Sequence, residues 1–174
     1  MYITEKYWGN YIGDTDDSLN LTAYLSGKQK EEISLAEIFS DFGLNKLKDD
    51  FRQTDFPLAY TDPEGWEIPI NYAIDLITDL AALLLECKVN GGIDLCELSG
   101  EDPEETAFLK LQITAASKEH DLIDRTLADF AADPLAFDLN EMCPEEDIKE
   151  MAALCEELRK ELYCGQHDHE QPSY

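Results

Sequence analysis

The segment from Ala73 to Cys87 is apolar around nearly its whole circumference when it is wound as a helix, and Asp75, Asp79 and Glu86 are its only charged residues. A helix of this kind must bury apolar side chains in several directions at once, so it belongs inside a folded protein. Its longest uninterrupted apolar run, Leu80 to Leu85, is far too short to cross a bilayer. The segment therefore predicts a nearly buried helix in a soluble protein that has no membrane partner.

The three acidic residues of this helix fall on one narrow stripe. We interpret the stripe as the exposed edge of the helix, because Glu86 continues the line that Asp75 and Asp79 begin. An alternative is that Asp75 and Asp79, one turn apart, are the acid and base of a hydrolase, which requires a cleft and raised pKa values. No phosphate-binding glycine loop, nucleophile elbow or dinucleotide fingerprint accompanies them. We therefore do not expect an enzyme.

Two segments favour β-strands. The residues TDPEG separate Pro57–Tyr60 from Trp66–Ile70, and apolar and polar side chains alternate after the turn, which predicts a β-hairpin. Between residues 106 and 115 a strict alternation of apolar and polar side chains favours another strand. A helix remains the alternative there, because Pro103 and acidic residues precede the segment.

Several residues mark the starts and ends of helices. Ser34 and Glu37 form a capping box that predicts a helix ending at Gly43. Ser117 is placed to cap one further helix, and Pro144 is placed to open another. In each of these segments apolar residues recur at intervals of three and four, so each helix has one face suited to a core.

The length of 174 residues suits a single domain with a continuous core. We predict a helix-rich α+β fold with a small antiparallel sheet, as one globular domain over residues 1–164 and a frayed tail over residues 165–174. Five cysteines without a Cys-x-x-Cys pair, and a start without a secretory signal, indicate reduced thiols and a cytoplasmic location. Cys164, His167 and His169 make an incomplete ligand set, so we predict no metal and no cofactor.

The charge of the chain narrows the choice of partners. Thirteen Lys and Arg residues against 39 Asp and Glu residues give a formal net charge of −26. Such a chain is not expected to bind nucleic acid, and it should meet basic partners rapidly. The stretches from Lys88 to Lys110 and from Arg125 to Lys149 contain no basic residue between their ends. Solubility alone is the simpler interpretation of this acidity.

The stretch YWGNYIGDTDDSLNL, from Tyr7 to Leu21, combines aromatic residues, glycines and carboxylates. It does not fit a calcium loop, because a count from Asp14 places leucine at the positions that require glycine and glutamate. We expect Asp16, Asp17 or Ser18 to cap a short helix, which leaves Asp14 and its neighbours free for another role.

Aromatic residues flanked by carboxylates are typical of protein interfaces, in which rigid aromatic anchors are surrounded by charge. This pattern occurs in the stretch just described and again at the hairpin turn. A core position for either tryptophan is the alternative. The candidate partner-binding residues are Trp8, Tyr11, Asp14, Asp16, Asp17, Asp62, Glu64 and Trp66.

The stretch YWGNYIGDTDDSLNL, the hairpin sequence LAYTDPEGWEIPINYAI leading into DLITDLAALLLE, and the acidity of the chain together resemble bacterial immunity proteins of polymorphic toxin systems. The resemblance implies that the protein binds a cognate toxin domain and blocks its active site or its access to substrate. Many toxic nucleases are basic because they bind a polyanion, so the expected partner is a basic toxin domain. The alternative is a nucleic-acid mimic that inhibits a DNA- or RNA-binding enzyme and tolerates many basic partners.

Overall fold

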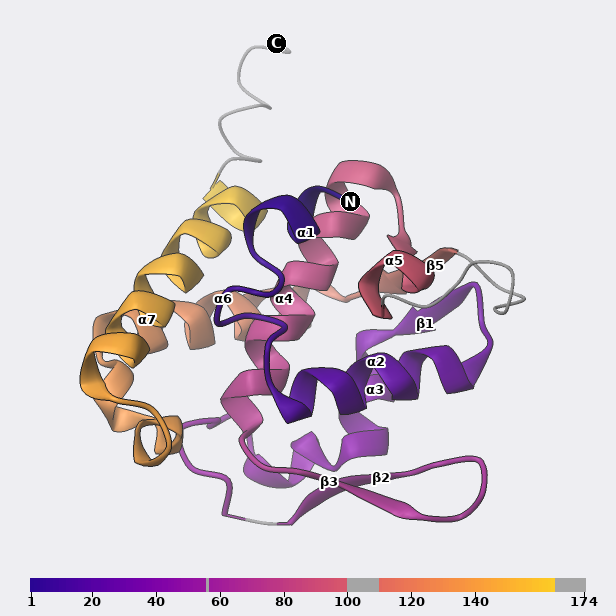
Figure 1. Cartoon of the computed structure of the whole chain (residues 1–174), viewed down its shortest axis with the longest axis horizontal. Coiled ribbons are helices and arrows are strands. Elements are labelled where there is room, and N and C mark those ends of the chain that lie inside the picture. The colour runs from indigo at the N-terminus through magenta and orange to yellow at the C-terminus, as the bar shows by residue number, and fades with distance from the viewer. Residues whose placement is uncertain (56, 100–109, 165–174) are drawn as a thin grey trace, which may run out of the picture.

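Helix α4 (Ala73–Asn90) runs through the middle of the molecule in the computed structural model of the chain (Figure 1). The structure describes residues 1–55, 57–99 and 110–164. Every residue of α4 from Ala73 to Glu86 is buried, which confirms the predicted buried helix. No helix in the described ranges has the length and apolar character needed to span a membrane.

The other helices pack around α4 or against its neighbours. They are α1 (Tyr2–Lys6), α2 (Asp16–Lys28), α3 (Leu35–Phe42), α5 (Leu95–Ser99), α6 (Ser117–Ala132) and α7 (Glu145–Arg159). Short 3-10 turns lie at Leu44–Leu47, Pro134–Ala136 and Asp138–Glu141, and a π-helical turn at Lys160–Cys164. In Figure 1, α6 and α7 lie side by side on one flank of α4, and α2 lies in front of the opposite flank.

The strands of the described residues form two small sheets. In the first, β5 (Lys110–Thr114) lies between β1 (Glu32–Ser34) and β4 (Ile93–Asp94), parallel to β1 and antiparallel to β4. In the second, β2 (Leu58–Thr61) and β3 (Glu67–Ile70) form an antiparallel hairpin. The helix-rich α+β prediction is therefore confirmed, and the sheets are mostly antiparallel.

The predicted hairpin is confirmed. The strand predicted within residues 106–115 is confirmed as β5, and residues 106–109 lie outside the described part of the chain. The predicted tail, residues 165–174, lies outside it as well. Ser34 caps α3 as predicted, because its Oγ accepts the N–H of Glu37 at 3.1 Å, and Gly43 ends that helix. The predicted capping box is only half formed, because the Glu37 carboxylate pairs with Lys28 and Lys30.

Two predicted helix caps are wrong. Helix α2 is capped by Thr15, whose extended backbone lets its Oγ1 accept the N–H of Ser18 at 3.1 Å, and the acidic residues that follow occupy the first turn. Helix α6 begins at Ser117 itself, so this residue is not the cap. There Glu119 Oε1 accepts the N–H of Ala116 at 2.7 Å instead.

The acidic stripe of α4 is buried, so the predicted exposed edge is wrong. Residues 1–18 cross this side of α4 (Figure 1), and they bring polar groups that need acceptors. Glu86 accepts the N–H of Ile3 at 2.9 Å, and Asp79 accepts the N–H of Gly13 at 2.9 Å. A buried backbone N–H requires a partner, so the stripe holds the N-terminal segment onto the core.

The buried apolar residues of the described chain form one cluster that includes residues from every helix named above. Tyr24 of α2, Phe42 of α3 and Tyr60 of β2 make an aromatic group within it. Their ring centroids are 4.7 Å apart for Tyr24–Phe42 and 5.2 Å apart for Phe42–Tyr60. This group fixes the hairpin against α2 and α3. Cys155 is fully buried in the same cluster.

Candidate functional site

The loop between α1 and α2 carries Trp8 and Tyr11, and both side chains are partly buried. The Trp8 ring packs so closely on Gly13 that a Cβ atom there would lie 2.2 Å from the ring. Tyr11 Oη donates a hydrogen bond to Glu150 Oε2 of α7 at 2.6 Å and lies 3.4 Å from Asp147 Oδ1. The two aromatic residues therefore fix the loop that presents Asp14.

The outer side of α2 is an exposed strip in which Asp16, Leu19, Ala23 and Gly27 recur at spacings of three and four residues. Leu19 is 69% exposed although its side chain is large and apolar. The small residues after it leave the surface of the helix open. This strip was not predicted from the sequence. The sequence did contain a signal for it. Leu19 and Leu21 are two residues apart and cannot share one face of a helix, so one of them had to be exposed.

The hairpin turn lies at the far end of the same helix. A Cβ atom on Gly27 would be 3.7 Å from Pro63, which places the turn against the C-terminal part of α2. Trp66 is 68% exposed, so it is not a core residue. Asp62 Oδ1 accepts the N–H groups of Glu64 and Trp66 at 3.0 and 2.8 Å and thereby shapes the turn.

The predicted contact residues thus form two groups, one in the loop before α2 and one at the hairpin turn, and these groups lie at opposite ends of α2. The rise of an α-helix puts about 16 Å between Asp16 and Gly27. The exposed strip of α2 joins the two groups into one area. We call this area the α2–hairpin surface, and it consists of Asp14, Asp16, Leu19, Ala23, Gly27, Asp62, Glu64 and Trp66.

Asp17 lies outside this surface. Its side chain is 1% exposed, and its two oxygen atoms accept the N–H groups of Asn71 and Tyr72 at 2.8 and 3.0 Å. Asp17 therefore links α2 to the start of α4 and cannot contact a partner, whereas Asp14, Asp16 and Glu64 are exposed.

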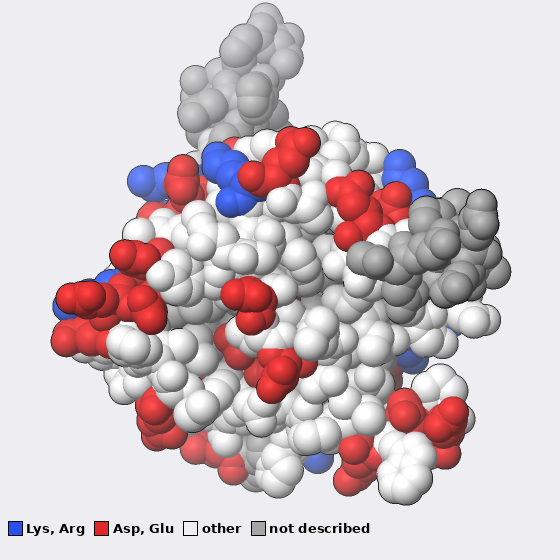
Figure 2. Space-filling view, in the orientation of Figure 1, with Lys and Arg blue, Asp and Glu red and all other residues white. Residues whose placement is uncertain are grey.

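Negative charge surrounds the α2–hairpin surface. In Figure 2, acidic side chains are spread over this face between broad uncharged areas, and basic side chains lie toward its margins. Lys28, at the end of α2, is already paired with Glu37 at 2.9 Å and Asp41 at 2.7 Å. The surface therefore combines exposed apolar side chains with carboxylates that have no lysine or arginine to neutralise them among the described ion pairs.

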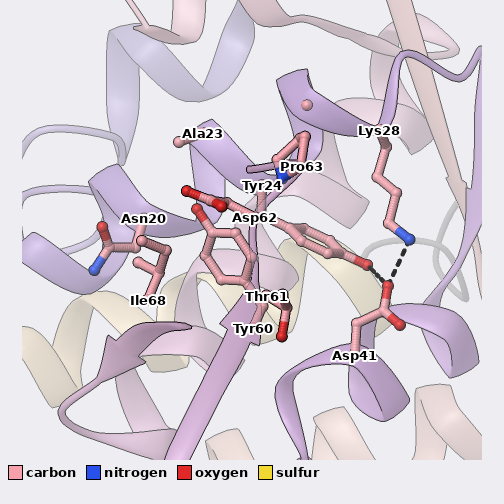
Figure 3. A pocket seen from close by; sticks show the side chains of 11 residues that line it. Asn20, Ala23, Tyr24, Lys28, Asp41, Tyr60, Thr61, Asp62, Pro63 and Ile68 are labelled. Atoms are coloured by element: carbon pink, nitrogen blue, oxygen red, sulfur yellow. Dashed lines mark hydrogen bonds and ion pairs between the residues drawn. The ribbon is translucent and has the colours of Figure 1, made fainter. Parts of the chain in front are cut away.

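A groove of about 630 Å³ lies between α2, the C-terminal end of α3 and the hairpin (Figure 3). Tyr24 and Tyr60 of the aromatic group line it, and Asp62 belongs to both the groove and the α2–hairpin surface. The groove is large enough to receive side chains of a partner.

Asp75 and Asp79 have the raised pKa values that the hydrolase alternative requires. Burial raises the pKa of Asp79 to about 7, against the opposing hydrogen bonds from Ser18 and Gly13. Burial, together with the charge of Asp79, also raises the pKa of Asp75 far above its ordinary range. Asp75 is 3% exposed and Asp79 is 1% exposed, so a substrate cannot reach them. Their arrangement does not support catalysis.

Metal binding finds no support in the described residues. In residues 1–55, 57–99 and 110–164, no group of three or more His, Cys, Asp or Glu side chains is placed to hold an ion. His167 and His169 lie outside these ranges.

Comparison with known proteins identifies the family. The family described as Immunity protein 68 matches residues 2–162, which is nearly the whole chain. No curated protein matches the chain, and no solved structure does. Immunity proteins are partners of toxins, and an exposed apolar surface surrounded by charge suits such a partner. The chain therefore belongs to the Immunity protein 68 family, a family of bacterial proteins that neutralise a toxin.

Proposed function

We propose that the protein neutralises a basic toxin domain in the cytoplasm by covering the active or substrate-binding surface of that domain with the α2–hairpin surface. The observation that carries the proposal is the exposure of Leu19 and Trp66, at 69% and 68%, on a face whose carboxylates have no lysine or arginine partner among the described ion pairs. Large exposed apolar side chains within a polar rim are the usual anchors of protein interfaces.

The charge supports a basic partner in particular. A protein of net charge −26 attracts basic proteins from a distance and speeds their encounter. The same charge repels nucleic acid and anionic membranes, so we propose neither as a partner. Asp14, Asp16 and Glu64 are exposed carboxylates of the α2–hairpin surface and take part in this attraction.

A toxin that acts on nucleic acid must itself be basic, and its basic surface is the one that an acidic protein covers most readily. In this complex Leu19 and Trp66 supply contacts that persist in salt. Trp8 and Tyr11 contribute their exposed edges and hold the loop in position. A nucleic-acid mimic would depend on charge alone and would have no use for the two exposed anchors.

The test is capture followed by inhibition. The full chain is immobilised, exposed to lysate of the source organism and washed with rising salt, and the retained proteins are identified. Each retained domain is then purified, and its toxic activity is titrated with the protein. We expect one basic domain that resists high salt and loses activity at a one-to-one ratio. Retention of many nucleic-acid enzymes that are all released by salt would overturn the proposal in favour of a mimic.

The matched control for this experiment is the double variant Leu19→Ala, Trp66→Ala. It removes the two anchors and leaves every charge in place, so it separates specific packing from electrostatic attraction. We expect the double variant to release the toxin domain at low salt. Retention equal to that of the unaltered protein would place the interface elsewhere.

A further inference from the structure

We propose that the groove between α2 and the hairpin binds an arginine side chain of the toxin domain, with Asp62 as its ionic partner and Tyr60 as its aromatic contact. This inference rests on the proposed function, because it names the chemical group that the same surface recognises. The groove, at about 630 Å³, has room for a long side chain together with part of the loop that carries it.

The aromatic lining of the groove is rigid. Tyr24 and Tyr60 lie edge to face, with their ring centroids 5.2 Å apart, and Phe42 packs against both rings. Each of the three side chains is at most 5% exposed. A surface that is already in place before binding loses little conformational entropy when a partner arrives.

One end of the groove has its charges compensated. Asp41 accepts a hydrogen bond from Tyr24 Oη at 2.5 Å and pairs with Lys28 Nζ at 2.7 Å. Figure 3 shows the two tyrosine rings between this Lys28–Asp41 pair and Asn20 at the opposite end. An incoming cation therefore finds no free carboxylate beside Lys28.

Asp62 is the carboxylate of the groove that has no cationic partner in the described ion pairs. Its Oδ1 is held by the N–H groups of Glu64 and Trp66, so the orientation of the carboxylate is fixed. No hydrogen bond to Oδ2 occurs in the described structure. Burial and, after it, the charge of Asp62 raise the pKa of Tyr60, which keeps that ring neutral. The groove thus holds one uncompensated negative charge beside an aromatic ring.

These groups suit arginine better than lysine. The guanidinium is planar, is weakly hydrated and carries five N–H donors, so it can lie against the small exposed part of the Tyr60 ring, whereas an ammonium is a compact, strongly hydrated charge. Asn20 Nδ2 donates to the carbonyl of Pro69 at 3.1 Å, which leaves the Asn20 side-chain oxygen as a further acceptor. The groove therefore offers several acceptors around one ring, as an arginine requires.

The test is a titration of the full chain with acetyl-arginine amide, followed by two-dimensional amide NMR. Acetyl-lysine amide and acetyl-citrulline amide are the comparison compounds. We expect saturable shifts at backbone amides of the groove, such as those of Gly27 and Thr61, with the arginine compound binding most tightly. Absence of saturable shifts, or equal binding of either comparison compound, would overturn the assignment.

Two variants test whether the negative charge of Asp62 binds the arginine compound. Asp62→Asn retains an Oδ1 that accepts the two turn hydrogen bonds but removes the negative charge, and we expect about 10-fold weaker binding of the arginine compound. Glu67→Gln removes one charge from the same hairpin, and its side chain points to the face opposite Ile68, which lines the groove. We expect no change for Glu67→Gln. Unchanged binding by Asp62→Asn would also overturn the assignment.

The captured toxin domain separates this inference from the proposed function. If the protein inhibits the toxin domain and Asp62→Asn inhibits it equally well, the proposed function stands and the arginine assignment is overturned. If no toxin domain is inhibited while the arginine compound still binds at the groove, the proposed function fails. Only the assignment of the groove as an arginine-binding site is then retained.

Discussion

Ser18 Oγ donates a hydrogen bond to Asp79 Oδ2 at 2.6 Å, and this bond joins the first turn of α2 to a carboxylate buried in α4. The N–H of Gly13 reaches the other oxygen of the same carboxylate at 2.9 Å. The loop that presents Asp14 is therefore anchored to the centre of the protein on both sides. The α2–hairpin surface depends on this buried attachment, so its properties can be tested through stability as well as binding.

The raised pKa of Asp79 predicts a stability that falls as pH rises. The folded-state pKa of about 7 exceeds the ordinary value of 3.8, so the folded protein binds more protons than the unfolded chain between these values. The free energy of unfolding should therefore decrease between pH 5 and pH 8, by about 3 kcal/mol. Asp79→Asn removes this titration, and urea unfolding at several pH values should give a flatter profile. Parallel profiles for the two proteins would contradict the prediction.

Gly13→Ala should destabilise the protein through two separate effects. The backbone of Gly13 has a φ of 76°, in the left-handed region, and the added methyl group would collide with the Trp8 ring. We expect a loss of about 2 kcal/mol or more. Gly9→Ala is the control, because Gly9 has a φ of 93° but no atom within 4 Å of a new Cβ. Urea unfolding that shows equal losses would mean that contact with Trp8 is unimportant.

The neighbours Asp16 and Asp17 should behave oppositely on substitution. Asp17→Ala leaves the N–H groups of Asn71 and Tyr72 without their acceptor and should lower the free energy of unfolding by about 2–3 kcal/mol. Asp16→Ala should cost less than about 1 kcal/mol, because it removes only an exposed charge from the first turn of α2. Thermal unfolding of both variants checks this. A larger loss for Asp16→Ala would mean that Asp16 has a structural role.

The two anchors and the surrounding carboxylates should affect different rate constants of toxin binding. Leu19→Ala or Trp66→Ala should raise the dissociation rate about 10-fold or more, with little change in stability. Asp14→Asn and Glu64→Gln should instead slow association, and only at low salt. Surface plasmon resonance with the purified toxin domain measures both rates. Val89→Ala is the control, since Val89 is 50% exposed but lies at the end of α4, outside the α2–hairpin surface.

Local signals in the sequence predicted much of the fold. The capping residue Ser34 and the turn residues TDPEG act within a few positions, so the α3 helix and the hairpin follow from them directly. Strand β1 was missed because it is three residues long and pairs Ile33 with Ile113, far along the chain. A pairing between residues so far apart in the sequence gives no pattern in the residues around Ile33 from which it could be predicted.

The candidate site was predicted only in part. The sequence indicated that aromatic residues and carboxylates gather at two places, but it could not show that α2 joins them into one surface. It also could not separate exposed Asp16 from buried Asp17, because both are acidic residues of one helical turn. Their difference comes from the backbone N–H groups at the start of α4, which approach only one of the two side chains.

Contacts between the two ends of the chain determine when the protein can act after synthesis. Tyr2 and Tyr7 of the first residues donate hydrogen bonds to Glu161, and Tyr11 donates one to Glu150. A chain emerging from the ribosome has the loop with Trp8 and Asp14 long before it has α7 to hold that loop. At about 5–20 residues per second, roughly 7 to 28 seconds pass between the two. Neutralising activity should therefore appear only after α7 has left the ribosome.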